Sequence, residues 1–325
     1  MEAEAPGVTV VVTCYQQAAY IEEALDSVAA QDLSDWDLIV TDDASTDGSP
    51  DRIRAWRSRH PERSVTLVLH DENVGITRTL NEALPLCRGR HLAYLGGDDL
   101  WAPDKLVRLV EALDMAPDAA VAYSDARLVD VDGDELEPSF LAARGHLPAP
   151  AGRVFVELLR HNFVIASSAV FRTDAIRAVG GWDPALAFED WDLLLHLADR
   201  WPVVVVPGSL VDYRIHDASV TRSRFGLMLE GRMAVLEKWL GRQPGHDAVI
   251  LPYLRYQSWR LYKVKPDQAR RHVAVAYADA GDLRGRLRYL VATRRVAELG
   301  FEGVRRLWRL RSYPRLRLRG GAAYR

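Results

Sequence analysis

Two adjacent carboxylates, Asp98 and Asp99, are the residues of this sequence best suited to chemistry. They follow a short apolar run, Leu92 to Leu95, and two glycines. This order predicts a buried strand that presents both acids at its carboxyl end, where open α/β sheets bind their ligands. Neighbouring carboxylates repel each other unless something positive lies between them, and a hard divalent cation carrying a phosphate fits that place. We therefore expect a cation and phosphate site at this strand end.

Three other predicted strands also end in clusters of acidic or polar residues. These clusters are Thr13 to Gln16, the pair Asp42-Asp43 with Asp47, and His70 to Gly75. None of them contains the G-x-G-x-x-G turn of dinucleotide-binding folds or the GxxxxGK[ST] phosphate loop. A nucleotide bound here would therefore be held by carboxylates and a metal rather than by a glycine-rich loop.

A further group of acids, Glu189, Asp190 and Asp192, begins a predicted helix. Acids at a helix N-terminus complement the helix dipole, and this interpretation suffices for Asp192. Trp182 and Trp191 flank the group. Aromatic faces often support sugar rings, but packing in the core explains either tryptophan at least as well.

The elements that must position these groups alternate between strand and helix. Apolar, β-branched runs predict four strands with helical periodicity between them, which indicates a parallel sheet with right-handed crossovers. Beyond the fourth strand, a strand followed by a turn at Asp132-Gly133 predicts that the sheet becomes mixed. The predicted strands are Val8 to Cys14, Asp37 to Thr41, Val65 to Leu69, His91 to Leu95, 119 to 131, Ser168 to Phe171, Val203 to Val206 and Leu210 to Ile215, the last as an edge strand.

From about Phe225 onward the patterns are helical, which places a domain boundary near residues 222–225. The expected helices cover 227–240, 248–262, 267–280 and 283–299. The end of the chain is strongly basic, because 13 arginines and two acids from Arg284 onward give it a net charge of +11, against −14 for the rest. Two interpretations of this tail stay open, a membrane-surface helix and a solvated arginine-rich helix end. The acidic body argues against nucleic-acid binding.

The remaining composition is that of a globular protein from a reducing compartment. Cys14 and Cys87 fall in predicted buried segments, lack metal-ligand spacing and do not indicate a disulfide. The N-terminal MEAEAPG lacks the basic and apolar regions of a signal peptide, and runs such as Val203 to Val206 are too short to span a bilayer. These features predict a cytoplasmic protein, which a membrane-binding tail would hold at the inner face of the membrane.

Five motifs, taken in order, resemble the family 2 glycosyltransferases. They are VVVTCYQQAAYIEEALDSVAAQ, DLIVTDDASTDGS, ENVGITRTLNEAL, YLGGDDLWAPDKL and GGWDPALAFEDWDLLL, and together they cover about residues 8–220. Members of this family are inverting, nucleotide-sugar-dependent enzymes of the GT-A fold. The resemblance implies an α/β domain over 1–222, with a Rossmann-like, mixed but mostly parallel sheet flanked by helices. Its nucleotide half would cover about 1–100, its acceptor half about 101–222, and residues 223–325 would form a C-terminal helical region with the arginine-rich tail.

On the nucleotide side, the resemblance assigns Thr13 and Tyr15 to the loop that frames the base. It assigns Asp42 to the acid that hydrogen-bonds the base, usually uracil, and an acceptor-only carboxylate suits the imide N–H of uracil or thymine. Capping of the next helix is the alternative for Asp42 and the better explanation for Asp47. Arg78 falls where the family places a basic residue near the nucleotide, and a solvated helix arginine is its alternative.

The GGDD segment departs from the family's usual D-x-D or D-x-D-D pattern, because Gly96 replaces the first acid. The resemblance implies that Asp98 contacts the ribose and that Asp99 binds Mg²⁺ or Mn²⁺ bridging the two phosphates. One acid fewer would lower the metal affinity in the absence of the nucleotide. His216, in a His-x-x-Ser pattern, would reach the metal or a phosphate, and a structural histidine is the alternative.

On the acceptor side, Asp190 matches the family's catalytic base, which takes a proton from the acceptor hydroxyl opposite the leaving diphosphate. Glu189, Trp182 and Trp191 would lie around the sugar and acceptor, and the segment NFVIASSAV matches the acceptor-side loop. The implied reaction transfers a sugar from a UDP- or dTDP-sugar to a hydroxyl of a glycan, glycolipid or small-molecule acceptor, with inversion.

Two other functions stay open on the sequence. A sugar-1-phosphate nucleotidyltransferase would carry a glycine-rich, basic loop after the first strand, and TCYQQAA is not such a loop. A non-catalytic sugar-nucleotide-binding or scaffold protein is favoured by Gly96 and disfavoured by the presence of Asp99 and Asp190.

Overall fold

The structure is a computed structural model, and it describes residues 6–186, 190–216, 225–242, 244–264 and 266–277. The chain divides into two compact units, residues 1–223 and 224–325. The predicted boundary falls between residues 222 and 223. Each unit is described by itself below.

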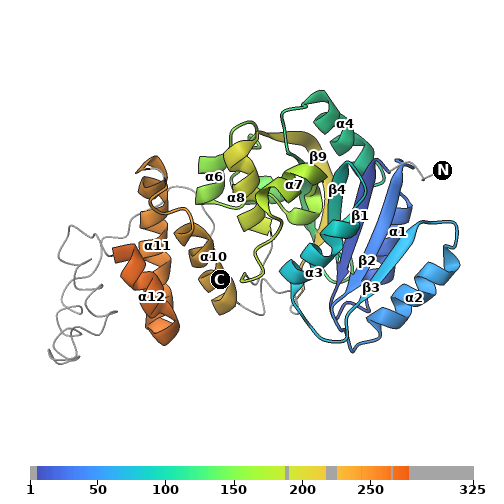
Figure 1. Cartoon of the computed structure of the whole chain (residues 1–325), viewed down its shortest axis with the longest axis horizontal. Coiled ribbons are helices and arrows are strands. Elements are labelled where there is room, and N and C mark those ends of the chain that lie inside the picture. The colour runs from blue at the N-terminus through green and yellow to red at the C-terminus, as the bar shows by residue number, and fades with distance from the viewer. Residues whose placement is uncertain (1–5, 187–189, 217–224, 243, 265, 278–325) are drawn as a thin grey trace. The chain divides into compact units, whose positions relative to one another are not determined.

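A nine-stranded sheet forms the centre of the first unit (Figure 1). Its strand order is β3-β2-β1-β4-β8-β6-β9-β5, with β7 paired to β6. The first four strands are parallel, β8 runs antiparallel between β4 and β6, and β9 runs parallel to β6. This confirms the predicted α/β fold with a mixed sheet. The strands are β1 (Val8–Cys14), β2 (Trp36–Asp42), β3 (Val65–Leu69), β4 (His91–Gly96), β5 (Leu100–Trp101), β6 (Val121–Val129), β7 (Glu135–Glu137), β8 (Ala169–Arg172) and β9 (Val203–Arg214).

One strand prediction was wrong in its placement. The runs predicted as two strands, Val203 to Val206 and Leu210 to Ile215, form the single strand β9, whose register on β6 shifts between Ser124 and Asp125. The second run is not an edge strand, because the two-residue strand β5 pairs with it. So short a strand carries too little periodicity to be read from sequence.

Helices cover both faces of the sheet (Figure 1). Alternating residues of a strand point to opposite faces, and β1 is buried along its whole length, so both faces of its apolar run are covered. One face packs on α1, α2 and α4, and the other carries α3, α6, α7 and α8. The helices of this unit are α1 (Ile21–Ala29), α2 (Ser49–Arg59), α3 (Ile76–Ala83), α4 (Lys105–Met115), α5 (Phe140–Ala143), α6 (Phe155–Arg160), α7 (Thr173–Val179) and α8 (Asp190–Arg200).

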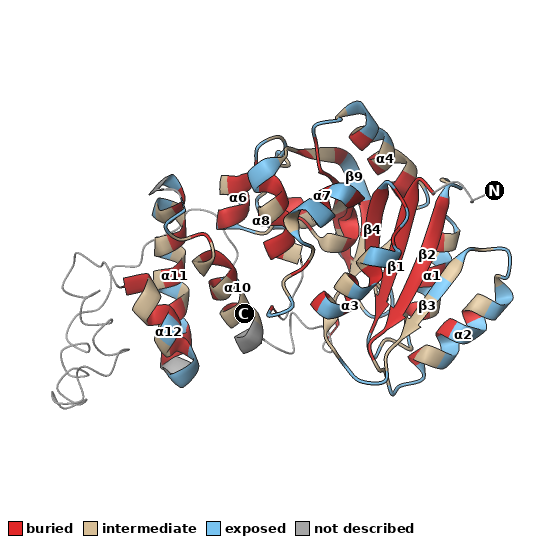
Figure 2. Cartoon of the chain, viewed as in Figure 1, coloured by how far each residue is buried: buried red, intermediate tan, exposed pale blue. Residues whose placement is uncertain are grey.

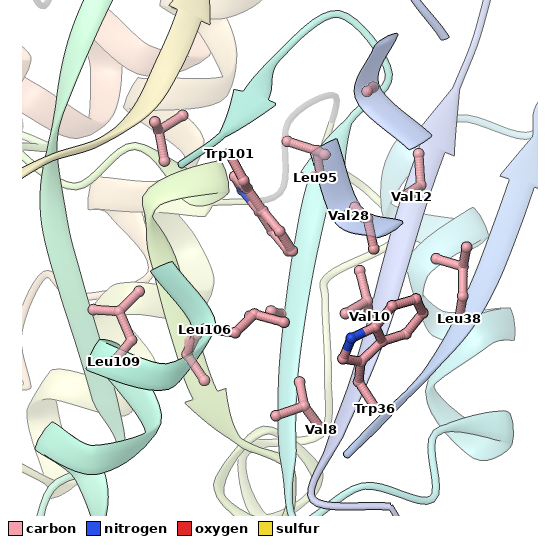
Figure 3. Packing of buried hydrophobic residues seen from close by; sticks show 14 of the residues in the cluster. Val8, Val10, Val12, Val28, Trp36, Leu38, Leu95, Trp101, Leu106 and Leu109 are labelled. Carbon is pink, nitrogen blue, oxygen red and sulfur yellow. The ribbon is translucent and has the colours of Figure 1, made fainter. Parts of the chain in front are cut away.

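An apolar cluster lies between the strands and the helices α1 and α4 (Figure 3). Strand β1 contributes Val8, Val10 and Val12, and α4 contributes Leu106 and Leu109. Figure 2 shows that β1 and β4 are buried almost throughout. Burying one such side chain stabilises the fold by about 1.5–3 kcal/mol, so the ends of these strands form a firm base for the loops that follow them.

The second unit contains three described helices, α10 (Phe225–Glu237), α11 (Pro244–Val264) and α12 (Pro266–Tyr277). Helices α11 and α12 pack together, and the Tyr277 hydroxyl donates to the Arg255 carbonyl at 2.9 Å. The predicted helix 283–299 and the arginine-rich tail lie outside the described residues. Among the residues that are described, no helix is long and apolar enough to cross a bilayer.

Candidate functional site

The carboxyl ends of the four parallel strands lie level with one another. Cys14 pairs with Asp42, Asp42 pairs with Leu69, and Thr13 pairs with Gly96. The chain passes from β1 to β2 and β3 on one side of β1 and then crosses to β4 on its other side. Open α/β sheets bind ligands in the crevice outside such a switch point, here between β1 and β4. The four polar clusters of the sequence therefore meet along one edge of the sheet.

The loops after β1 and β2 are tied to each other on the crevice. The Gln16 amide donates to the Ser45 hydroxyl at 2.8 Å, and the Ala18 amide donates to Asp47 Oδ2 at 2.8 Å. Gln16 and Ala44 have φ of 56° and 60°, in the left-handed region that non-glycine residues rarely adopt. Such backbone strain tends to persist at functional sites, where the surrounding contacts hold it in place.

Asp42 carries a carboxylate oxygen that the protein does not satisfy. The residue is only 1% exposed, and its Oδ1 accepts the Ser45 amide at 2.8 Å. Its Oδ2 is buried and has no hydrogen-bond partner among the described residues. An unpaired buried acceptor costs roughly 1–3 kcal/mol, which makes this oxygen a candidate acceptor for a donor on a bound ligand.

The neighbouring acid, Asp43, has a different place that the sequence did not reveal. Its Oδ1 accepts the Val74 amide at 2.8 Å and lies 3.0 Å from His70 Nδ1, while its Oδ2 accepts the Gly75 amide at 2.8 Å. Asp43 therefore holds the N-x-G turn, Asn73 to Gly75, that leads into α3. One sequence signal could have revealed this role. Asp43 is the second acid of the pair that follows β2, and β2 lies next to β3, the strand that precedes the turn.

The remaining nucleotide-side residues are distributed around the crevice. The Thr13 hydroxyl donates to the Leu95 carbonyl at 3.5 Å, so this side chain turns into the sheet between β1 and β4. Tyr15 is 41% exposed in the loop after β1, where its ring can face a ligand. Arg78 is exposed on the first turn of α3.

Asp98 and Asp99 occupy very different environments. Asp98 Oδ2 lies 2.9 Å from His216 Nε2, and 18% of the Asp98 side chain is exposed. Asp99 is 3% exposed, and its oxygens accept the Ser167 hydroxyl at 2.6 Å and the Arg214 amide at 3.0 Å. Burial, reinforced by the charge of Asp98, raises the pKa of Asp99 well above its usual range, against the hydrogen bonds from Ser167 and Arg214.

The two glycines before this pair have a steric cause. A Cβ on Gly96 would lie 2.8 Å from Asp98 Oδ1, and one on Gly97 would lie 2.7 Å from Gln17 Oε1 and 2.9 Å from Ile21 Cδ1. The Asp98 carboxylate thus fills the space that a side chain at position 96 would need.

Arg214 is a second residue that the sequence did not reveal, because the strand pattern of LVDYRI concealed it. Its side chain is buried, and its Nε donates to the Asp98 carbonyl at 3.0 Å. Its other nitrogens donate to the Val131 carbonyl at 2.8 Å and to Glu23 Oε2 at 3.1 Å, and the guanidinium lies 4.7 Å from the Tyr20 ring centre. Arg214 therefore fastens the loop that carries Asp98 and Asp99, called the acidic loop below, to α1 and to the β6–β7 turn.

Asp190 begins α8 with both carboxylate oxygens hydrogen-bonded. Its Oδ2 accepts the Asn162 side-chain amide at 2.7 Å, and its Oδ1 accepts the Trp191 backbone amide at 2.6 Å. Asn162 was not singled out from the sequence, since it lies in a loop without any periodic pattern. Glu189 lies outside the described residues.

The two tryptophans near Asp190 lie in the interior and do not present an open ring face. Each is 3% exposed. The Trp191 indole donates to the Leu158 carbonyl at 2.7 Å, and the Trp182 ring packs edge-on against Tyr94, with ring centres 6.1 Å apart. Packing in the core accounts for both residues, so the sugar-platform interpretation of the sequence is replaced by a structural one.

The residues present fit a divalent cation only in part. Within the described part of the chain, no group of three His, Cys, Asp or Glu residues could hold a metal ion. Asp98 and His216 form an oxygen–nitrogen pair at the open side of the acidic loop. Mg²⁺ and Mn²⁺ are commonly bound by one or two protein groups with substrate phosphates completing the shell, and this donor set suits that arrangement.

Comparison with known proteins gives the site its context. The chain is 32% identical to the uncharacterized protein Rv1520 of Mycobacterium tuberculosis over 225 residues, 67% of this chain and 61% of that protein. It is 32% identical to the succinoglycan biosynthesis protein ExoO of Rhizobium meliloti over 224 residues, 67% of this chain and 63% of that protein. The chain therefore spans less than two thirds of the length of these relatives.

A solved structure agrees in fold. The mannosyltransferase PcManGT from Pyrobaculum calidifontis, in complex with GDP-Man and Mn²⁺, aligns with a TM-score of 0.59 and 25% identity, covering 93% of this chain and 83% of that one. The model of glycosyl transferase family 2 matches residues 9–180, more than half of the chain. The protein belongs to glycosyl transferase family 2.

Proposed function

We propose that this protein transfers a sugar from a UDP- or dTDP-sugar to an acceptor hydroxyl, with inversion at the anomeric carbon and with Asp190 as the general base. Family membership supports a glycosyl transfer reaction. The observation that carries the donor assignment is the unpaired, buried Oδ2 of Asp42 at the crevice.

The hydrogen bonds of Asp42 favour a pyrimidine base over guanine. Guanine offers two adjacent donors, N1–H and N2–H, which pair best with a carboxylate that has both oxygens available. In Asp42 the Ser45 amide already occupies Oδ1, which leaves Oδ2 for one donor. Uracil and thymine offer a single imide N–H, so one available oxygen suits them. PcManGT is described in complex with GDP-Man, and a preference for GDP is therefore the alternative outcome.

We further propose that Asp98 and His216 face the diphosphate and its Mg²⁺ or Mn²⁺. This differs from the expectation that Asp98 contacts the ribose and Asp99 the metal. The reason is that Asp98 is the more exposed carboxylate, whereas both oxygens of Asp99 already accept hydrogen bonds from the protein. A bound divalent cation would offset charge on the leaving diphosphate. In this proposal Asp99 is not a ligand of the cation, and its hydrogen bonds hold the loop that carries Asp98 in place.

The proposed transfer requires one proton acceptor on the side opposite the leaving group. The acceptor oxygen attacks the anomeric carbon, the bond from that carbon to the phosphate oxygen breaks, and its electron pair leaves with the nucleoside diphosphate. The acceptor proton passes to the Asp190 carboxylate. Asp190 suits this role because two N–H donors fix its orientation at the start of a helix.

We propose that the acceptor is a hydroxyl of a glycan or glycolipid in polysaccharide or glycoconjugate synthesis, as the name of ExoO suggests for a relative. The basic tail would then hold the enzyme at an anionic membrane surface. Flotation with anionic liposomes, comparing the full chain with a chain that ends at residue 282, tests this part. Equal flotation of the two proteins removes the membrane contact.

The experiment that tests the proposed function is a panel of UDP-, dTDP- and GDP-sugars with Mn²⁺, measured for the wild type and for Asp190→Asn. We expect turnover with a uridine or thymidine donor, loss of about three or more orders of magnitude in kcat for Asp190→Asn, and unchanged UDP binding. No turnover with any donor, together with intact nucleotide binding, would favour a non-catalytic binding protein. Near-normal activity of Asp190→Asn would show that another group is the base.

A further inference from the structure

One short segment, residues 162–167 between α6 and β8, contacts both ends of the proposed active site. Asn162 at its start bonds the carboxylate of Asp190, and Ser167 at its end bonds the carboxylate of Asp99. We infer that Asn162 and Ser167 are positioning residues, and that this segment sets where the base lies relative to the acidic loop of the donor site. The inference rests on the proposed function, since it assumes that Asp190 is the base.

Asn162 is held so that only one end of its amide can face Asp190. Its Oδ1 accepts the Val164 amide at 3.3 Å, which turns the Nδ2 group toward Asp190 Oδ2 at 2.7 Å. The Trp191 amide occupies the other carboxylate oxygen at 2.6 Å. These two donors, on different oxygens, fix the plane of the Asp190 carboxylate.

Ser167 fastens the other end of the segment to the acidic loop by three bonds. Its hydroxyl donates to Asp99 Oδ2 at 2.6 Å and accepts the Gly96 amide at 3.4 Å. Its carbonyl accepts the Trp101 indole N–H at 2.8 Å. Ser167 is buried, so these bonds form away from water, where an unpaired partner would be costly.

The residues between the two contacts anchor the segment in the interior. Phe163 and Val164 are buried in the core, and the Ile165 carbonyl accepts both the amide and the hydroxyl of Ser168, at 2.8 and 2.7 Å. Five residue steps span at most about 18 Å even when fully extended, so the segment limits the separation of its two contact points. A displacement of about 1 Å in reacting groups can cost roughly 100-fold in rate.

The test compares Asn162→Ala, Asn162→Asp, Ser167→Ala and the control Ser168→Ala in the full chain. Ser168 directly follows the segment and is also buried, and its hydroxyl donates within its own turn, to the Ile165 carbonyl. We expect both Asn162 variants to lower kcat by about 10- to 100-fold while the donor KM and UDP binding stay within about threefold of wild type. We expect Ser167→Ala to raise the donor KM and weaken UDP binding with Mn²⁺, and Ser168→Ala to match the wild type.

The isosteric variant separates positioning from space filling. Asn162→Asp keeps the shape of the side chain, removes its donor and places a negative charge against the Asp190 carboxylate. A contact with the base therefore makes Asn162→Asp at least as impaired as Asn162→Ala, whereas a role in packing alone makes Asn162→Ala the worse variant. If both Asn162 variants retained wild-type kcat while Asp190→Asn was inactive, the inference would be overturned and the proposed function would stand. If Asp190→Asn itself remained active, the assignment of Asp190 as the base would be wrong, and the proposed function would fail rather than the positioning inference alone.

Discussion

The Nε2 atom of His216 lies 2.9 Å from Oδ2 of Asp98, which joins two residues that are 118 positions apart. Two positions before His216, Arg214 bonds the Asp98 carbonyl with its side chain and Asp99 Oδ1 with its backbone amide. The end of β9 therefore closes over the loop that follows β4. The proposed donor side therefore combines residues from both predicted halves of the domain.

The contact between His216 and Asp98 predicts a defect in cation binding when His216 is replaced. We expect His216→Ala to raise the Mn²⁺ concentration needed for tight UDP binding by at least about tenfold, because one of the two proposed protein ligands is lost. Calorimetric titration of UDP at several Mn²⁺ concentrations measures this. His60→Ala is the control, because His60 contacts the Trp56 carbonyl on α2. An unchanged Mn²⁺ requirement in His216→Ala would remove His216 from the cation site.

A methyl group at position 96 should displace the Asp98 carboxylate. The new Cβ of Gly96→Ala would lie 2.8 Å from Asp98 Oδ1, so the Asp98 carboxylate must move away from its contact with His216. We expect UDP binding with Mn²⁺ to weaken by about tenfold or more, since a displaced carboxylate loses its aligned contact. Gly245→Ala is the matched control, because a Cβ there meets nothing within 4 Å. Unchanged binding in Gly96→Ala would show that Asp98 moves without consequence.

The two buried tryptophans should differ in what they contribute to stability. Trp191→Phe leaves the Leu158 carbonyl without its indole donor, whereas the Trp182 indole N–H has no hydrogen-bond partner in the described part of the chain. Both substitutions remove the same volume. We therefore expect Trp191→Phe to lower the free energy of unfolding by about 1–3 kcal/mol more than Trp182→Phe, as measured by urea denaturation. Equal losses would contradict a separate contribution from the Trp191 hydrogen bond.

Asp47 should make the fold sensitive to acid. Burial raises the pKa of Asp47, but donors outweigh it, namely the Ser49 hydroxyl and the amides of Ala18 and Ser49, and the pKa falls below its ordinary value of 3.8. A group with a lowered pKa in the folded state stabilises the fold above its unfolded pKa, and this contribution is lost as the pH falls through the folded pKa.

We expect the stability of the wild type to fall more steeply below about pH 4 than that of Asp47→Asn, whose side chain does not titrate. Urea unfolding at a series of pH values from about 6 to 2 measures the difference. Asp51→Asn is the control, because the Asp51 side chain is 87% exposed in the first turn of α2, the helix that follows Asp47. If the free energy of unfolding fell equally steeply at low pH in Asp47→Asn and in the wild type, this would count against the role of Asp47 in joining the loops after β1 and β2.

Much of the fold was readable because its signals are local. The run Val8–Cys14 is mostly apolar and β-branched, all of its residues are buried in β1, and its predicted bounds are those observed. The alternation of such runs with amphipathic helices implied the parallel half of the sheet and the edge at which Asp42 and Asp98 appear. The two-residue strand β5 could not be predicted, because it forms only through pairing with β9.

The sequence by itself determined which residue types stand at the strand ends, because strand and helix periodicity and the order of the motifs are local properties of the chain. Only the tertiary structure decided how those residues are used. It placed Asp43 on the N-x-G turn, Asn162 on Asp190 and His216 on Asp98, and it buried Asp99 against Ser167. These contacts join residues from 28 to 118 positions apart, and no local pattern encodes which distant donor a carboxylate will meet.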